Sequence, residues 1–351
     1  MLYQIKNQHG GDVYGGCITL DFSANTNPLG TPPGVLEAVC RALPRLHRYP
    51  DPYCRRLVQA IAGHEQVPAS YILCGNGAAD LIYTYCAALR PRTAVELAPT
   101  FVEYGAGLAQ VGCRVERYFL HQAQNFDLDE RFLSFLAGKK PEVVFLCNPN
   151  GRLIPLPLLE QILQYCAAQG ARLFLDECFL DLTEDGVSAK SLLAAHPELL
   201  ILKAFTKSYG MAGIRLGYCL CADNALLRRM AAASPPWNVS SPAQSAGVAA
   251  LAERDFLQRT LSLVHTERRW LTDNLTALGF WVCPSHANYL LFRGPLGLRE
   301  GLLRQGIAIR GCGNYNGLGD GWYRIAVRPH GENEALITAI RQFCKEKSLW
   351  Q

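Results

Sequence analysis

A lysine and an arginine, eight positions apart, follow a strand-like apolar run in the second half of the chain. Lys207 stands two residues after the run 199–205, and Arg215 follows a stretch of small residues. Burial at a strand end disfavours the ammonium form of a lysine, and a neutral amine attacks aldehydes. An arginine in the same pocket can bind a phosphate through two parallel hydrogen bonds. The pair could therefore hold a molecule with an aldehyde and a phosphate, although alone it is equally typical of surface residues after a core strand.

An acidic residue and a glycine-rich turn could complete the binding of such a molecule. Asp176 ends a short apolar run, where α/β sheets place ligand chemistry, and its carboxylate could pair with a protonated ring nitrogen. The turn before the helix expected over 78–89 offers N–H groups to a phosphate, at Gly75, Asn76 and Gly77. Asp176 could also cap a helix, and many strand–helix turns carry such glycines. An aldehyde, a phosphate and a ring nitrogen together describe pyridoxal 5′-phosphate (PLP).

The order and spacing of these motifs resemble the fold-type I PLP enzymes, the aspartate aminotransferase superfamily. The motifs that carry the resemblance are Gly75-Asn76-Gly77, Pro99-Thr100-Phe101-Val102-Glu103-Tyr104, Cys147-Asn148-Pro149-Asn150, Asp176, Lys207 and Arg215. The resemblance extends from His9 to about Phe343 and is greatest for the branch that contains histidinol-phosphate aminotransferase and L-threonine-O-3-phosphate decarboxylase. Three stretches favour the decarboxylase side of this branch, namely His9-Gly10-Gly11, residues 21–30 and residues 309–318.

The resemblance assigns roles at the cofactor to most of these residues. It implies that Lys207 binds the cofactor covalently and later moves protons, that Asp176 pairs with the pyridine nitrogen, and that Tyr104 stacks on the pyridine ring. The cofactor-binding residues that it implies are Gly75, Asn76, Gly77, Asn150, Thr206 and Arg215. Tyr49 matches a tyrosine that reaches the cofactor phosphate of the neighbouring subunit, which implies a homodimer with shared active sites. From the residues alone, Tyr104 could equally lie in the core and Tyr49 on the surface.

The resemblance also names residues for the substrate. It assigns Arg324 to an α-carboxylate and Arg310 to a distal phosphate or to the carboxylate, so that a small molecule with two anionic ends is expected. His9 and the segment 25–30, which includes Asn27 and Gly30, would close over that substrate. Two solvated arginines at strand edges are the alternative interpretation.

Three departures from the family's pattern affect the cofactor site. The family's Asn-Pro-Asn-Asn-Pro-Thr-Gly is shortened to Asn148-Pro149-Asn150-Gly151, so three residues are missing beside Asn150, the residue expected at the cofactor's phenolic oxygen. Phe179 replaces a tyrosine that would give this oxygen a second hydrogen bond. Ala204 replaces a hydroxyl residue three positions before the lysine, and Thr206 is the candidate that could hold the phosphate instead.

Three functions are compatible with the sequence. The first is decarboxylation of L-threonine O-3-phosphate, or a similar O-phospho amino acid, to aminopropanol phosphate for cobamide assembly. The second is transamination of histidinol phosphate or of an aromatic amino acid. The third is a catalytically impaired PLP-binding protein, because the loop is shortened. In PLP chemistry the bond held perpendicular to the ring breaks, so substrate orientation decides between the first two, and a sequence does not give that angle.

Composition narrows the class of protein. The chain has 351 residues, 49% of them hydrophobic, and a formal net charge of +4 without a long basic run, which argues against disorder and nucleic-acid binding. No apolar run has the length of a membrane span, and we expect neither a membrane segment nor a signal peptide. The 14 cysteines include no C-x-x-C pair and do not cluster with histidines, so we expect free thiols, no metal and a cytoplasmic location.

The predicted fold is α/β, of the fold-type I PLP transferase kind. We expect an arm over 1–45 that joins the small domain, a large PLP-binding domain over 46–235, and a bridging helix with a small α+β domain over 236–351. Alternating strands and helices predict a mostly parallel, doubly wound sheet in the large domain. The expected strands are 94–97, 143–147, 173–176, 199–203 and 214–221, and the expected helices are 78–89, 156–168 and 224–233. One helical stretch is expected from about 242 to 278.

Overall fold

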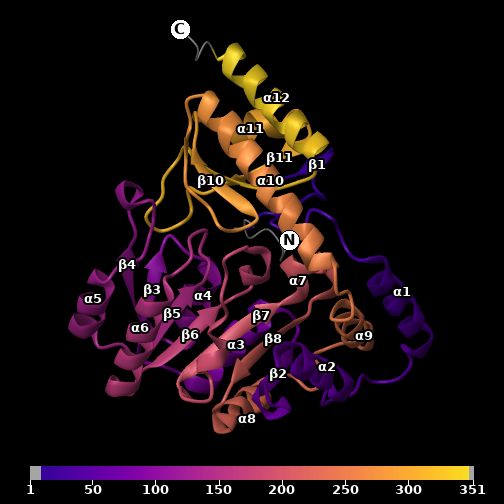
Figure 1. Ribbon diagram of the computed structural model, residues 1–351, viewed down its shortest axis with the longest axis vertical. Coiled ribbons are helices and arrows are strands. Elements are labelled where there is room, and N and C mark those ends of the chain that lie inside the picture. The colour runs from indigo at the N-terminus through magenta and orange to yellow at the C-terminus, as the bar shows by residue number, and fades with distance from the viewer. Residues whose placement is uncertain (1–8, 348–351) are drawn as a thin grey trace.

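A seven-stranded sheet is the largest element of the computed structural model, which describes residues 9–347 (Figure 1). The strand order is β2 (Ile72–Gly75), β8 (Gly217–Cys221), β7 (Leu199–Ala204), β6 (Arg172–Asp176), β5 (Val143–Cys147), β3 (Thr93–Ala98) and β4 (Arg114–Phe119). β8 is antiparallel to both of its neighbours, and all other neighbouring strands are parallel. The mostly parallel sheet is confirmed, and β2 and β4 are added to the predicted strands.

Side chains of the central strands alternate between two apolar faces of this sheet. Val144 and Leu146 pack into the core on one face, while Val143 and Phe145 of the same strand pack into the core on the other. One face is covered by α3 (Ala78–Leu89), α4 (Val102–Gln110) and α8 (Asn224–Ala233), and the other by α2 (Arg55–Glu65), α5 (Arg131–Lys139) and α6 (Leu156–Gln169). Because both faces are covered, these strands are apolar throughout, and hydropathy alone predicts them.

The C-terminal part forms a second, smaller layer, orange to yellow in Figure 1. Its antiparallel sheet has the order β12 (Arg310–Gly311), β13 (Trp322–Ala326), β10 (Tyr289–Arg293) and β9 (Trp281–Val282). This part also contains the helices α11 (Leu298–Leu303) and α12 (His330–Glu346). The N-terminal strand β1 (Leu20–Asp21) pairs in parallel with β11 (Ile307–Ala308). Phe22, which follows β1, is completely buried in the core of this smaller part, so the N-terminal segment joins it.

The helical stretch predicted from about 242 to 278 is two helices, α9 (Ser241–Ala250) and α10 (Phe256–Ala277). The buried residues of α9 are small, and a Cβ on Gly247 would lie 2.6 Å from the side chains of Leu57 and Leu216. This close packing places α9 against α2 and α1 (Pro33–Ala42), whereas α10 carries larger side chains towards the C-terminal part. The turn at 251–255 lets α9 and α10 run in different directions. The boundaries at 45 and 235 stay predictions.

The parallel strands end at one edge of the large sheet, towards the C-terminal part. β3 leads to Pro99 and Thr100, β5 to the shortened loop and β6 to Asp176, while β7 runs into α7 (Phe205–Ser208), which carries Lys207. Within residues 9–347, no helix has the length and apolar character needed to cross a membrane.

Candidate active site

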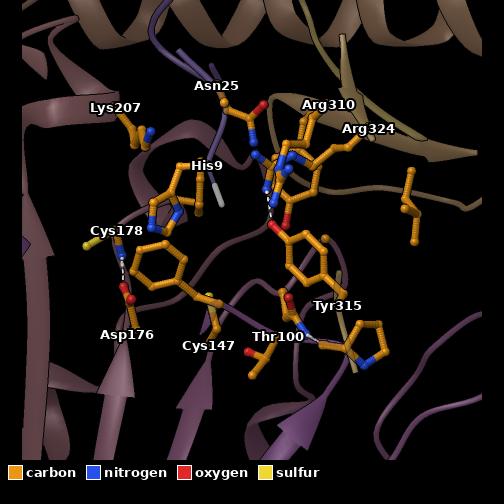
Figure 2. A pocket seen from close by; sticks show the side chains of 18 of the residues that line it. His9, Asn25, Thr100, Cys147, Asp176, Cys178, Lys207, Arg310, Tyr315 and Arg324 are labelled. Atoms are coloured by element: carbon orange, nitrogen blue, oxygen red, sulfur yellow. Dashed lines mark hydrogen bonds between the residues drawn. The ribbon is translucent and has the colours of Figure 1, made fainter. Parts of the chain in front are cut away.

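A cavity of ≈ 520 Å³ lies at the carboxyl ends of these strands, beneath the C-terminal part. It brings together nine of the residues predicted from the sequence, namely His9, Tyr104, Asn150, Asp176, Thr206, Lys207, Arg215, Arg310 and Arg324. Figure 2 shows Lys207, His9 and Asp176 on one side of the pocket and Arg310, Arg324 and Tyr315 on the other. Residues 315 positions apart in the chain thus share one site.

Lys207 has the electrostatic environment of a nucleophilic amine. Burial, followed by the charges of Arg324 and Arg215, lowers the pKa of Lys207 to about 8. Its Nζ lies 5.7 Å from the centre of the Phe179 ring, which adds an apolar wall. At neutral pH more of this amine is neutral than in an ordinary lysine, so it is prepared to attack an aldehyde.

Asp176 is a buried carboxylate that lacks a cation. Its Oδ2 accepts a 2.6 Å hydrogen bond from the Tyr104 hydroxyl, and its Oδ1 accepts one of 2.9 Å from the Cys178 N–H. Burial raises the pKa of Asp176 in spite of these bonds. No residue between 9 and 347 forms a salt bridge with Asp176, and the charge of Lys207 lowers its pKa by less than burial raises it. A protonated ring nitrogen in the cavity would supply the missing positive charge.

Tyr104, which is predicted to stack on the pyridine ring, packs among aromatic side chains and supports Asp176. Its ring is completely buried, edge-on to Phe101 at 5.6 Å and tilted against Phe145 at 5.5 Å, and its hydroxyl donates to Asp176 Oδ2. The stacking of Tyr104 on the cofactor stays a prediction. Phe101 is half-buried at the cavity wall and is the better candidate for stacking. The helical spacing of Tyr104 and Leu108 was the signal that Tyr104 belongs to the core.

The residues that line the phosphate end of the cavity follow the predicted ones directly in the sequence. Gly75, Asn76 and Gly77 do not line the cavity, because their turn satisfies itself: the Asn76 N–H donates to Asp80 Oδ2 and the Gly77 N–H donates to the Gly75 carbonyl, both at 2.8 Å. Ala78 and Ala79 line the cavity instead. They open α3, and the first N–H groups of a helix have no partner within it.

Arg215 lies against this turn. A Cβ on Gly77 would come within 2.7 Å of Arg215 Nη2, and the φ of Gly77 is +86°. A glycine is therefore needed there for the guanidinium to reach the cavity, where Thr206 also borders the same end. One charge, one hydroxyl and a helix N-terminus form an anion site that fits a phosphate monoester.

Asn150 still reaches the cavity after the deletion. Its Nδ2 donates to the Pro99 carbonyl at 2.8 Å, and the residue lines the pocket together with Gly151. Asn148 does not line it, because its Oδ1 is bonded to the Ile154 N–H at 2.9 Å. The shortened loop therefore retains one asparagine at the site.

The opposite wall is cationic. Arg310 and Arg324 are register partners on β12 and β13, so their side chains lie on the same face of the small sheet. The Arg324 Nη1 donates to the Tyr315 hydroxyl at 3.3 Å, whereas its Nε is buried and has no hydrogen-bond partner among residues 9–347. Arg310 donates to Asn314 Oδ1 at 2.8 Å. Two adjacent guanidinium groups suit two anionic groups on one ligand.

His9 also lines the cavity. Its Nε2 is 2.7 Å from Glu103 Oε1, and the Tyr83 hydroxyl donates to Glu103 Oε2 at 2.5 Å. The His9 ring also packs on Phe101, with 5.7 Å between the ring centres. The carboxylate thereby orients the imidazole over the pocket.

Asn27 and Gly30, the residues of segment 25–30 that are predicted to contact the substrate, have other partners in this structure. Asn27 is 1% exposed and its Nδ2 donates to the Ser208 carbonyl and to Thr260 Oγ1, at 2.7 and 2.9 Å. Gly30 packs its carbonyl against Gly210. Neither lines the cavity.

Asn25, two residues earlier, lines the cavity instead and lies near the two arginines (Figure 2). It is 1% exposed, and within residues 9–347 neither its Oδ1 nor its Nδ2 has a hydrogen-bond partner. A buried amide left unpaired in this way is costly and points to a ligand.

Tyr49 lies outside the cavity of its own chain. It is 78% exposed and stacks on Trp237, with 4.5 Å between ring centres. Such a position fits a residue that serves another subunit. Residues 9–347 contain no group of three or more His, Cys, Asp or Glu side chains that could hold a metal.

Fold and site together define a fold-type I PLP enzyme, and comparison with known proteins gives the same class. The sequence model described as aminotransferase class I and II matches residues 18–343. The chain is 38% identical to threonine-phosphate decarboxylase of Salmonella typhimurium over 96% of both chains. The chain belongs to the class I and II aminotransferase family, whose members depend on PLP.

Two solved structures illustrate the likeness of the fold. The histidinol-phosphate aminotransferase from Clostridium acetobutylicum has a TM-score of 0.86 and 28% identity, covering 93% of this chain and 99% of that one. The histidinol-phosphate aminotransferase from Sinorhizobium meliloti, solved in complex with pyridoxal-5′-phosphate, has a TM-score of 0.82 and 24% identity, covering 93% and 92%. Both decarboxylase and aminotransferase relatives are thus close to this chain.

Proposed function

We propose that this protein is a PLP-dependent carboxy-lyase that converts L-threonine O-3-phosphate, or a similar O-phospho amino acid, to aminopropanol phosphate in cobamide biosynthesis. The observation that carries the proposal is the adjacent pair Arg310 and Arg324 on the wall that faces Lys207. The 38% identity to threonine-phosphate decarboxylase supports the same substrate.

The cofactor would be held at four places by residues of this chain. Lys207 would bind its aldehyde, Asp176 its ring nitrogen, and Arg215, Thr206 and the start of α3 its phosphate. When bound, PLP supplies an electron sink for the electron pair left by the broken bond. Asp176, supported by Tyr104, would keep a positive charge on the ring nitrogen, and Phe101 would help to exclude water from the cofactor.

The chain's own residues would orient the substrate for loss of carbon dioxide. A planar guanidinium fixes the plane of a carboxylate through two parallel hydrogen bonds, which a lysine could not do. We assign Arg324 to the carboxylate, because its buried Nε has no hydrogen-bond acceptor among residues 9–347. We assign Arg310 and His9 to the phosphate. The Asn25 amide would bond the substrate between them. The Lys207 amine is then placed to return a proton to the carbon that lost the carboxylate.

Transamination of histidinol phosphate is the second candidate, because the Clostridium aminotransferase has the same fold. Histidinol phosphate carries a phosphate but no carboxylate, so one of the two guanidinium groups would face no anion. An unpaired arginine in a partly buried pocket is unfavourable, which favours the substrate with two anionic groups.

We also propose a homodimer with shared active sites, as in the family. Tyr49 and Trp237 stack on the surface, and Leu46 and Tyr53, which are near Tyr49 in the sequence, are also exposed. Exposed apolar side chains of this kind are typical of a subunit interface. The cytoplasmic location stays a prediction.

Substrate selectivity tests the two-anion proposal. Arg310→Gln and Arg324→Gln should each lower kcat/KM for L-threonine O-3-phosphate by roughly 30-fold or more, equivalent to about 2–5 kcal/mol for an unpaired anion. Arg310→Gln should have a much smaller effect on L-threonine, which has no phosphate, and L-threonine should be a poor substrate throughout. Equal rates on threonine and its phosphate ester would contradict the phosphate assignment.

A further inference from the structure

The shortened loop is fastened to the C-terminal part by a single histidine. The His286 N–H donates to the Gly151 carbonyl at 2.8 Å, and the Leu153 N–H donates to His286 Nδ1 at 3.3 Å. One residue therefore bonds the loop on both sides of Arg152, through its backbone and through its side chain.

The turn that carries His286 is itself firmly held. Arg268 on α10 donates through Nη1 to the carbonyls of His286 and Ala287, each at 3.2 Å. Ser285 Oγ donates to the Tyr289 carbonyl at 2.7 Å and accepts from the Ala287 N–H at 3.1 Å. His286 is thus a fixed point for the loop, which is also held where the Arg152 guanidinium donates to Asp127 at 2.6 and 3.1 Å.

Asn150 is the residue of this loop whose position these contacts help to fix. Its side chain is bonded to the Pro99 carbonyl, and its backbone pairs with Arg152, from N to O at 3.2 Å. The two hydrogen bonds of His286 are made to the residues immediately before and after Arg152. On the other side of the loop, a Cβ on Gly151 would lie 3.6 Å from the Tyr289 ring. The position of Asn150 is therefore set by Pro99 on one side and by the His286 contact on the other.

We propose that His286 is a positioning residue that replaces the support lost with the three missing residues and directs Asn150 towards the cofactor. The inference rests on the proposed contact of Asn150 with the cofactor's phenolic oxygen, and not on whether the substrate is decarboxylated or transaminated.

The imidazole must be unprotonated at Nδ1 to accept from the Leu153 N–H. Its surroundings maintain this state: burial, Arg152 and Arg268 lower the pKa of His286, against the opposite effect of Asp127 and Asp185. The contact therefore persists at neutral pH and is lost only when acid protonates the ring.

The test compares His286→Ala, which loses the acceptor, with His286→Asn, whose Oδ1 can accept in place of Nδ1. The readouts are the dissociation constant of PLP and the pH dependence of the near-visible absorption of the bound cofactor. His286→Ala should weaken PLP about 5- to 10-fold, the equivalent of one ordinary hydrogen bond, and should shift the absorption midpoint in the same direction as Asn150→Ala. His286→Asn should recover most of both, and His64→Asn on the exposed end of α2 should change neither.

The double variant His286→Ala, Asn150→Ala decides whether His286 acts through Asn150. We expect it to match Asn150→Ala alone, whereas additive effects would overturn the proposal. An unchanged spectrum in Asn150→Ala would also overturn it, by removing the cofactor contact on which it rests, while leaving the proposed reaction standing. If His286→Ala does not fold, the spectrum of the wild type should change on acidification while that of His286→Asn does not, and equal behaviour would contradict the role.

Discussion

At the scale of single residues, the site depends on two groups whose pKa values are shifted in favour of their neutral forms. Burial lowers the pKa of Lys207 and raises that of Asp176, so an amine is made available and a carboxylate is left in need of a cation. Shifts of this kind gather at functional sites, because chemistry needs groups that a stable fold alone would avoid.

Asp176→Asn should lower turnover by roughly 100-fold or more, because a positioned charge in such a site is worth several kcal/mol. In the PLP-free protein the same change should increase the free energy of unfolding at neutral pH. The raised pKa of Asp176 means that the ionised carboxylate destabilises the folded state. This destabilisation is fully present above the pKa of Asp176 in the folded protein, and it disappears below its pKa in the unfolded protein. Urea unfolding at about pH 7 and about pH 4 measures this, since the gain should shrink with acid. An equal gain at both would contradict the interpretation.

The PLP-free protein should take up PLP faster as the pH rises, with the rate levelling off near the Lys207 pKa of about 8. The neutral amine is the reactive form, and an ordinary lysine would not level off below about pH 10. Stopped-flow absorption in the near-visible follows the reaction. Lys207→Ala should never develop the band of the covalently bound cofactor, and a normal band in that variant would rule out the assignment.

At the scale of elements, two asparagines of one motif in the N-terminal segment make different contacts. Asn27 ties the segment to α7, next to Lys207, and to α10, whereas Asn25 presents an unpaired amide to the cavity. The sequence motif gives both residues the same appearance, and only packing separates them.

Asn27→Ala should destabilise the fold by about 2–4 kcal/mol, because the Ser208 carbonyl and the Leu29 N–H would lose their partner in a buried place. Asn25→Ala should change the unfolding free energy by less than about 1 kcal/mol, since no protein bond is lost, but should raise KM for the phosphorylated substrate. Chemical denaturation and steady-state kinetics on both variants provide the comparison. A reversal of the two effects would contradict the assignments.

How much the sequence could predict varied with the kind of element. Helices α3 and α8 and strand β5 have the predicted bounds, because apolar runs between clear turn residues mark them. Strand β4 was missed because an edge strand with Arg114, Glu116 and Arg117 has no apolar pattern. The motif order brought Asp176, Lys207 and Arg215 together correctly. The hydrogen bond of Tyr104 to Asp176, and the bonds of His286 to the shortened loop, are contacts across the fold that no local pattern contains.

At the scale of the whole molecule, the cavity lies between the large sheet and the C-terminal part. The large sheet supplies the cofactor residues and the small sheet supplies Arg310 and Arg324. Tyr49 lies outside this arrangement, on the surface, which a second subunit would explain.

Mixing Lys207→Ala and Tyr49→Ala subunits tests shared sites directly. If Tyr49 serves the partner's cofactor, each mixed dimer contains one intact site, and random exchange should recover about a quarter of wild-type activity from two impaired parents. Sedimentation should give a dimer in all cases. An active monomer, or no recovery on mixing, would contradict the shared site.

The most direct test of the central claim is the fate of the carboxylate. The PLP-loaded protein is incubated with L-threonine O-3-phosphate labelled with ¹³C in the carboxylate, with and without a keto-acid acceptor. The account predicts labelled carbon dioxide and aminopropanol phosphate in equal amounts, independent of the acceptor. Retention of the label in a phosphorylated keto acid, formed only with the acceptor, would contradict the decarboxylase and make the protein an aminotransferase.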